Sequence, residues 1–302
     1  MKKIVVVMST YNGATVVTRQ LDSIFSQKDV EPVVCIRDDG SKDNTASILK
    51  EYKDSIYPKQ MFVDYGENVG WERSFLLALR NAPDADYYAF SDQDDLWFET
   101  KLGNAVKRLD RENPSLPILF HCNKLTVDSQ LRPLKKQVVR LEQPLNRKNA
   151  LMQEYTQGCS IVMNKAAKEL VCRYEPREKI AHDFWCGLLC YLFGRIIYDD
   201  EKYFYHICYG SNASGEGHPW KSRFSRFKAF FSSKNIYRLP IDDLLCGYGD
   251  MLSADDLKFI NVLKNYKYSF LKKIKLLVST EFVRSSFYGT LSLKFAILMN
   301  RL

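Results

Sequence analysis

Short apolar stretches alternate with segments of helical spacing along the first 110 residues. Compact apolar or β-rich runs typical of buried strands occupy residues 4–8, 33–37, 61–64 and 87–90. The segments that follow them have the apolar period of amphipathic helices, over residues 16–26, 45–52, 73–79 and 99–110. Strands that alternate with helices form parallel sheets covered on both faces, so the pattern predicts an α/β fold. Such sheets bind ligands at the carboxyl ends of their strands.

The pattern continues less regularly after residue 110. Further strands are predicted at residues 118–121, 159–163 and 195–198, and helices at 165–173 and 183–193. The polar, basic and proline-containing stretch 128–149 is typical of a long loop or flap. Helical signals return at 252–263, 270–277 and 291–302. We therefore expect one α/β domain over residues 1–219 and a helical C-terminal region over residues 220–302.

Composition favours a folded protein of the cytoplasm. Hydrophobic residues make up 46% and charged residues 26% of the 302 residues, which argues against a disordered chain. The eight cysteines include no C-x-x-C pair, so we expect reduced core residues rather than a zinc site. The apolar run after Lys3 is too short for a signal peptide, and no apolar stretch is long enough to span a bilayer.

The net charge of +8 is unevenly distributed along the chain. Residues 221–302 carry 15 Lys and Arg residues against 6 Asp and Glu residues, whereas residues 1–220 carry 29 against 30. A nucleic-acid enzyme would line its cleft with basic residues, so the near-neutral first part argues against nucleic acid as a partner. The basic end instead suggests contact with an anionic surface.

Two groups of acidic residues follow predicted strands, on the ligand side of the expected sheet. Asp38 and Asp39 follow the second strand, and Asp92, Asp94 and Asp95 follow the fourth. Taken singly, such residues commonly cap the next helix. Three carboxylates within four residues repel one another, and hard divalent ions prefer such oxygen ligands. We therefore predict a Mg²⁺ or Mn²⁺ site at Asp92 and Asp94.

Four short motifs occur in order along the chain. They are Ser9-Thr10-Tyr11-Asn12, Asp38-Asp39-Gly40-Ser41, Asn68-Val69-Gly70 and Ser91-Asp92-Gln93-Asp94-Asp95-Leu96-Trp97. Neither a P-loop nor G-x-G-x-x-G follows the first strand, which argues against a P-loop NTPase or a standard dinucleotide enzyme. In order and spacing the four motifs resemble the family 2 glycosyltransferases, over about residues 1–215. The resemblance implies a GT-A fold, a Rossmann-like and mostly parallel sheet flanked by helices.

The resemblance also implies an activity and roles for individual residues. Such enzymes transfer a sugar from a nucleotide diphosphate-sugar with inversion at the anomeric carbon. Residues expected to bind the donor come from the four motifs: Thr10, Tyr11, Asn12, Asp39, Asn68, Gly70 and Asp92. Thr10, Tyr11 and Asp39 would hold the base and ribose. Asp94 would hold the cation that bridges the diphosphate, and Asp92 would contact the sugar-nucleotide.

An inverting transfer needs a general base that takes the proton of the acceptor hydroxyl. The segment Ala181-His182-Asp183-Phe184-Trp185 is similar to the His-Asp-aromatic-Trp segment of rhamnosyltransferase-like members, and it puts Asp183 at the base position. Asp183 could also cap a helix, and the two roles are compatible. Trp185 could stack on an acceptor sugar beside His182, or it could belong to the core of an amphipathic helix.

Two departures from the family pattern limit this transfer of roles. Residues 206–212 lack the Arg and the second His of the family's Tyr-Arg-x-His-Gly-Ser-Asn form. A third metal ligand therefore stays open between His206 and His218, and an isolated His is more often structural. Ser74 stands where many relatives have Asn after Asn68-x-Gly70, which leaves that donor contact undefined.

Basic and apolar residues interleave at 270–277 and 291–302, as in helices that lie on anionic membranes. Arg223, Arg226 and Lys228 add to the same charge. The alternative is that these helices pack on the catalytic domain with their basic residues merely solvated. We expect peripheral association with the inner face of the cell membrane.

Together these features predict a metal-dependent inverting glycosyltransferase that acts on a lipid-linked or growing bacterial surface glycan. The first candidate donor is dTDP-L-rhamnose. UDP-hexoses and UDP-N-acetylhexosamines are alternatives, because relatives that use them resemble this chain in the same segments. A non-catalytic sugar-nucleotide-binding subunit is a further alternative.

Overall fold

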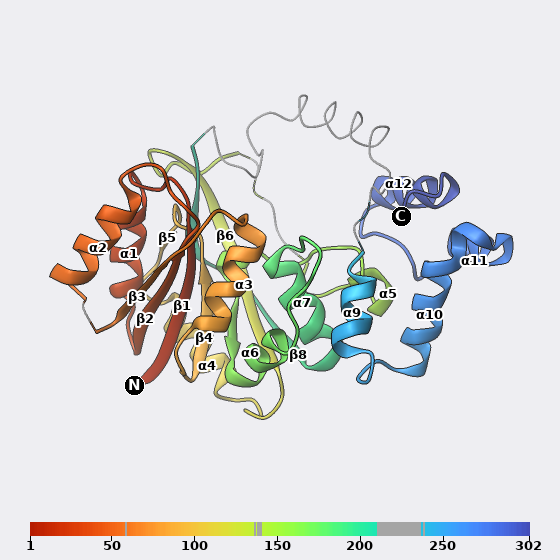
Figure 1. The fold of residues 1–302 in the computed structure, drawn as a ribbon, viewed down its shortest axis with the longest axis horizontal. Helices are drawn as coiled ribbons and strands as arrows, with labels where there is room; N and C mark the ends of the chain where they lie inside the picture. The colour runs from red at the N-terminus through yellow and green to blue at the C-terminus, as the bar shows by residue number, and fades with distance from the viewer. Residues whose placement is uncertain (58, 136, 138–140, 210–236, 238) are drawn as a thin grey trace. The chain divides into compact units, whose positions relative to one another are not determined.

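The chain divides into two compact units. The computed structural model describes residues 1–57, 59–135, 137, 141–209, 237 and 239–302. The first unit comprises Met1–Gln143 and Tyr155–Tyr209, and the second comprises Pro144–Glu154 and Gly210–Leu302 (Figure 1). The second unit therefore takes a short segment from the middle of the chain. His218, Arg223, Arg226, Lys228 and residues 210–212 lie outside the described residues.

An eight-stranded sheet forms the centre of the first unit, in the order β3-β2-β1-β4-β7-β6-β8-β5. Its strands are β1 (Lys2–Thr10), β2 (Val30–Asp38), β3 (Met61–Tyr65), β4 (Tyr87–Ser91), β5 (Leu96–Trp97), β6 (Ile118–Asp128), β7 (Val162–Asn164) and β8 (Arg195–Cys208). Strands β1 to β4 are parallel, as are β6 and β8, whereas β7 and β5 run antiparallel to their neighbours. The predicted α/β fold with a mostly parallel sheet is confirmed.

Helices cover both faces of this sheet. They are α1 (Val17–Phe25), α2 (Thr45–Ser55), α3 (Trp71–Asn81), α4 (Lys101–Leu109), α6 (Lys165–Cys172) and α7 (His182–Phe193). Helices α1, α2 and α4 share one core with alternate strand residues such as Ile4 and Val6. Helix α3 packs against β1 and β2 and is drawn beside them in Figure 1. Strand β1 is buried over five consecutive residues because both of its faces are covered.

Three of the predicted strands have different extents in the structure. The strands predicted at 118–121 and 195–198 continue to Asp128 and Cys208 as β6 and β8. The two strands pair with each other in parallel, with a bulge in the register. The backbone groups of their polar second halves therefore form hydrogen bonds within the sheet. The strand predicted at 159–163 is shorter and later in the structure, where β7 covers Val162–Asn164. The start of the predicted strand belongs instead to a 3₁₀ turn, η1 (Gly158–Ser160).

The second unit is helical. Its elements are α5 (Arg147–Ala150), α9 (Ile241–Tyr248), α10 (Ala254–Asn265), η2 (Tyr266–Tyr268), α11 (Phe270–Val278) and α12 (Phe287–Leu298). The guanidinium of Arg147 donates two hydrogen bonds, of 2.9 and 2.7 Å, to Asp256 on α10. Ser253 and Asp256 form a capping box at the start of α10. Among the described residues no helix has the length and apolar character needed to cross a membrane.

We predict that Gly194→Ala destabilises the first unit. A Cβ atom at Gly194 would lie 2.0 Å from the backbone oxygen of Pro117, and that oxygen also accepts the Arg195 N–H at 2.9 Å. The strands must shift to relieve this clash, so we expect a loss of about 1–3 kcal/mol in the free energy of unfolding. Thermal unfolding measures the loss. Ser115→Ala, in an exposed position of the preceding loop, is the control and should leave the melting temperature unchanged.

Candidate active site

The loops at the carboxyl ends of β1 and β2 are joined by the Asp38 carboxylate. Its Oδ2 accepts a hydrogen bond of 2.8 Å from Thr10 Oγ1, and its Oδ1 accepts the Ser41 N–H at 2.9 Å. Asn12, at a left-handed φ of 49°, accepts the Lys42 N–H at 2.8 Å on its side-chain oxygen. The first and second sequence motifs therefore form one hydrogen-bonded structure.

Asp39 connects the second motif to the third. Its carboxylate forms a buried ion pair with Arg37 and accepts the N–H groups of Val69 and Gly70 at 3.0 and 2.9 Å. Gly70 has a φ of 90°, which favours glycine at this turn before α3. Asp39 is 2% exposed, so its carboxylate holds the loop in place. Its predicted contact with the nucleotide base remains a prediction.

The first motif also meets the fourth. The N–H of Tyr11 donates to Gln93 Oε1 at 3.0 Å, and Gln93 Nε2 donates to the Tyr11 carbonyl at 3.1 Å. Thr10 is completely buried, whereas Tyr11 is 43% exposed and Asn68 is exposed. Of the residues predicted to bind the base and ribose, Tyr11 therefore offers an accessible ring.

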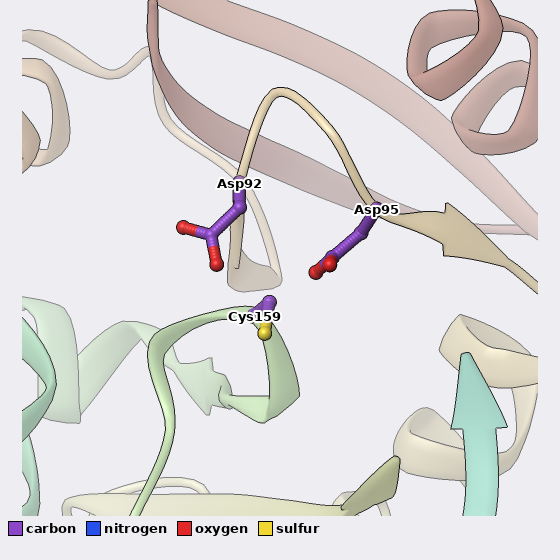
Figure 2. A group of neighbouring side chains, drawn as sticks. All are labelled: Asp92, Asp95 and Cys159. Atoms are coloured by element: carbon purple, nitrogen blue, oxygen red, sulfur yellow. The ribbon is translucent and has the colours of Figure 1, made fainter. Parts of the chain in front are cut away.

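An acidic cluster lies in the loop between β4 and β5. Figure 2 shows the side chains of Asp92 and Asp95 pointing toward Cys159, which comes from the turn η1. One ligand atom from each of these three residues lies within 4.8 Å of the others. The structure thus places Asp95 beside Asp92, and the pairing of Asp92 with Asp94 at a metal ion remains a prediction. Asp94 is partly exposed in the same loop.

Burial and mutual repulsion perturb these carboxyl groups. Burial, reinforced by the charges of Asp95 and Asp94, raises the pKa of Asp92 from 3.8 to about 7. Burial and the Asp95 charge likewise raise the pKa of Asp94 to about 6. The Oδ2 atom of Asp95 is buried without a hydrogen-bond partner in the described part of the chain. The cluster therefore carries more negative charge than its hydrogen bonds compensate.

Two basic side chains interact electrostatically with this cluster. His206 Nδ1 is 3.0 Å from Asp95 Oδ1. Burial by itself lowers the pKa of His206. The hydrogen bond to Asp95 and the negative charge of Asp95 together outweigh burial, so the pKa of His206 is raised. Lys101 is fully buried on α4, with Nζ 3.2 Å from the centroid of the Trp97 ring. Burial lowers its pKa to about 8, although the surrounding thiols and carboxylates oppose this shift.

The acidic cluster fits a hard divalent cation. Buried, mutually repelling carboxylates and the uncompensated Oδ2 of Asp95 supply oxygen ligands, which such ions prefer. Burial raises the pKa of the Cys159 thiol well above its usual value, so the thiol stays protonated. A protonated thiol is a poor ligand, and this favours an oxygen-bound metal over a zinc site.

Asp183 lies at the other side of the turn η1. Its Oδ2 accepts the N–H of Gly158 at 3.2 Å, and Gly158 is the neighbour of Cys159 in the acidic group. Asp183 is in the first turn of α7, and its Oδ1 accepts the Phe184 N–H at 2.8 Å. A three-residue turn thus connects Asp183 to the acidic cluster, and two N–H groups hold its carboxylate.

The neighbouring residues predicted to contact an acceptor lie in the core. Trp185 has no exposed surface, so it has no face on which a sugar could stack. His182 stacks on Phe75 at 4.0 Å and meets Phe90 edge-on at 4.6 Å. Burial lowers the pKa of His182 to about 4, so the ring is neutral. For Trp185 the core alternative therefore holds in this structure, because α7 is buried nearly all round.

Sequence reasoning missed several residues of this site. Lys101 and Cys159 had no motif around them to mark their proximity to the acidic loop. Arg19 on α1 lowers the pKa of Asp94 through its charge and donates to the hydroxyl of Tyr209. A signal for Arg19 existed, since it lies on the helix that follows the first motif.

The sheet and its acidic loop define the class of protein. A Rossmann-like sheet with flanking helices and carboxylates after β4 is the GT-A fold of glycosyltransferases. Residues 5–171 match the sequence model of the family described as "Glycosyl transferase family 2". The chain belongs to this family.

Comparisons with individual proteins agree with this assignment. The chain is 32% identical to the dTDP-rhamnosyl transferase RfbG of Shigella flexneri over 162 residues, which are 52% of this chain and 54% of RfbG. It thus spans about half the length of the curated relatives it matches. Among solved structures, Staphylococcus aureus TarS 1-349 in complex with UDP-GlcNAc has a TM-score of 0.56 at 18% identity, over 93% of this chain and 77% of that one.

A second solved structure is the mannosyltransferase PcManGT from Pyrobaculum calidifontis, in complex with GDP-Man and Mn²⁺. It has a TM-score of 0.55 at 19% identity, over 99% of this chain and 85% of that one. These two likenesses establish the GT-A fold of the chain.

We predict that Asp92→Asn stabilises the metal-free protein above neutral pH. Asp92 has a pKa of 3.8 when unperturbed, as in the unfolded chain, and of about 7 in the folded protein. Between these two pH values the folded protein binds more protons than the unfolded chain, so wild-type stability falls as pH rises through this window. The amide has no charge to bury. We expect a melting temperature about 2–4 °C higher at about pH 8, and no gain near pH 4. A gain that does not change with pH would contradict this explanation. Asp200→Asn, an exposed substitution on β8, is the control.

We also predict that Asp39→Ala destabilises the first unit in the absence of any ligand. The substitution leaves the Arg37 guanidinium buried without its ion-pair partner and frees the loop before α3. The expected loss is about 3–5 kcal/mol. Denaturant unfolding followed by tryptophan fluorescence measures it. Asp64→Ala, which removes an exposed carboxylate from β3, should change stability little. Equal stability of Asp39→Ala and wild type would show that the ion pair does not hold this loop.

Proposed function

We propose that the protein is a metal-dependent, inverting glycosyltransferase that moves a sugar from a nucleotide diphosphate-sugar to a hydroxyl group of a bacterial surface glycan. The observation that carries the proposal is the convergence of four loops at one edge of the sheet. There the carboxylates of the partly exposed Asp92 and the buried Asp95 lie across the turn η1 from Asp183. Membership of family 2 supports the reaction class.

In this proposal Asp183 is the general base. Its carboxylate takes the proton of the acceptor hydroxyl as the hydroxyl oxygen attacks the anomeric carbon and the bond to the diphosphate breaks. The N–H groups of Gly158 and Phe184 orient the carboxylate, which reduces the reorganisation needed during proton transfer. The charge of Arg19, next to Asp94, would add positive potential where the diphosphate departs.

The metal site in this proposal consists of Asp92 and Asp94, with Asp95 behind them. Mg²⁺ or Mn²⁺ bound there would offset the charge that grows on the leaving diphosphate. Tyr11 would contact the nucleotide base through its exposed ring.

For the donor we propose dTDP-L-rhamnose, on the likeness to the Shigella rhamnosyl transferase. UDP-hexoses and UDP-N-acetylhexosamines are the alternative donors, and the solved relative TarS binds UDP-GlcNAc. For the acceptor we propose a lipid-linked glycan, with the protein peripheral on the inner face of the cell membrane.

The test is donor hydrolysis and binding with dTDP-rhamnose, UDP-glucose and UDP-N-acetylglucosamine, each with Mg²⁺ or Mn²⁺. We expect one donor to be preferred and its turnover to need the cation. Asp183→Asn should lower turnover by about 10²–10⁴-fold while donor binding by calorimetry stays within a few-fold, because the amide keeps an acceptor for Gly158 N–H. Asp94→Asn should weaken metal-dependent donor binding. Asp200→Asn is the control for both variants.

Two outcomes would contradict the proposal. Indifference to every donor would exclude a nucleotide-sugar enzyme. Donor binding that ignores the metal, with turnover unaffected by Asp183→Asn, would indicate the non-catalytic sugar-nucleotide-binding subunit instead.

A further inference from the structure

The second unit exposes an unusual amount of apolar surface on α11 and α12. Six apolar side chains of this region are between 71% and 88% exposed: Tyr268, Phe270, Leu271, Val278, Phe287 and Tyr288. Single exposed apolar residues are ordinary, but a contiguous group of this kind marks an interaction site.

Helical spacing gathers these side chains on one face of each helix. On α11 the exposed apolar positions are Phe270, Leu271, Ile274 and Val278, whereas Leu276 is buried. On α12 the exposed positions Phe287, Leu291 and Phe295 recur every four residues. The inner side of α12 is filled by Leu293, Ala296 and Ile297, all fully buried. Helix α12 therefore has one packed apolar face and a second, exposed one, whereas α11 buries only Leu276 and exposes most of its apolar side chains.

The two helices are joined to each other. Lys273 Nζ donates to the carbonyl of Leu298 at 3.2 Å, and Lys294 Nζ donates to the carbonyl of Leu276 at 2.7 Å. Each lysine thus binds a carbonyl in the last turn of the neighbouring helix. We call the exposed apolar residues of the pair the α11–α12 face: Phe270, Leu271, Ile274, Val278, Phe287, Tyr288, Leu291, Phe295 and Leu298.

The segment that carries this face is rich in positive charge. Residues 266–302 contain seven basic residues and one acidic residue, Glu281. Glu281 forms an ion pair with Lys148 of the same unit, so it does not offset the charge next to the face. Lys267 and Lys275 are exposed at α11 and its approach. The face thus combines aromatic and aliphatic side chains with surrounding cations.

The combination of exposed apolar side chains and lysines favours an anionic bilayer over a second copy of the chain as the partner. A second copy of the chain, docked symmetrically, would bring the same face against itself and set its positive charges against one another. An anionic bilayer offers the opposite charge to the lysines and an apolar layer to the side chains between them. Tyrosine and phenylalanine rings are also suited to the boundary between headgroups and acyl chains.

We propose that the α11–α12 face is a docking surface for anionic lipid bilayers, on which the face lies with its apolar side chains inserted among the headgroups. The inference deepens the proposed function and rests on it in one respect, since a lipid-linked acceptor is presented at such a surface. The docking itself depends only on the apolar and basic residues of the second unit.

The experiment is flotation of the full chain with two kinds of vesicle, phosphatidylcholine alone and phosphatidylcholine mixed with phosphatidylglycerol. We expect wild type to float with the mixed vesicles and to be released by high salt. The fourfold variant Phe270→Ser, Leu271→Ser, Phe287→Ser and Tyr288→Ser should partition about tenfold more weakly or worse. Lys267→Glu with Lys275→Glu should lose the preference for phosphatidylglycerol.

The matched control is Phe62→Ser with Leu145→Ser, two exposed apolar residues outside the face. It should float like wild type. Melting temperatures of all variants report whether they fold, and light scattering reports their oligomeric state.

Three results would overturn the inference. They are a wild type that floats with neither vesicle, a fourfold variant that floats like wild type, and a wild-type dimer that the fourfold variant converts to monomer without any vesicle binding. Donor hydrolysis without vesicles separates this inference from the proposed function. Hydrolysis without flotation refutes the docking alone, and flotation without hydrolysis refutes the enzyme alone.

Discussion

The arrangement of the site depends on how the carboxylates of Asp38 and Asp39 are used. Both are buried at the end of β2, and a buried carboxylate is tolerated only when donors or a cation satisfy it. Asp38 takes its donors from the ends of β1 and β2, and Asp39 takes Arg37 and the turn before α3. Because these donors lie on loops far apart in sequence, satisfying two side chains brings the loops together.

The acidic loop after β4 presents the opposite situation. Asp92, Asp94 and Asp95 are close together without enough donors, and the raised pKa values of Asp92 and Asp94 report that deficit. His206 and Lys101 supply partial compensation, one through a hydrogen bond and the other through its field from inside the core. Such uncompensated charge is typical of sites that complete themselves with a ligand.

The two units are stabilised by different means. The first buries a sheet between two layers of helices, and its polar groups at the strand ends are held by one another. The second relies on short helices joined by side-chain contacts, such as Arg147 with Asp256 and Lys294 with the end of α11. It also leaves a group of apolar side chains, such as Phe270 and Tyr288, exposed on α11 and α12. The catalytic proposal therefore concerns the first unit, and the docking proposal concerns the second.

Local pattern determined much of this protein. The periodicity of apolar residues predicted the strands and helices of the first half, and four ordered motifs indicated the family. Both signals come from residues that are close together along the chain. Pattern could not show that η1 would replace a strand, that β6 and β8 would extend by pairing with each other, or that Trp185 would be buried. Pattern predicted the acidic loop, but only packing brings Cys159 and His206 to it. Those outcomes belong to the tertiary structure, because they depend on contacts between segments whose separation in sequence carries no local signal.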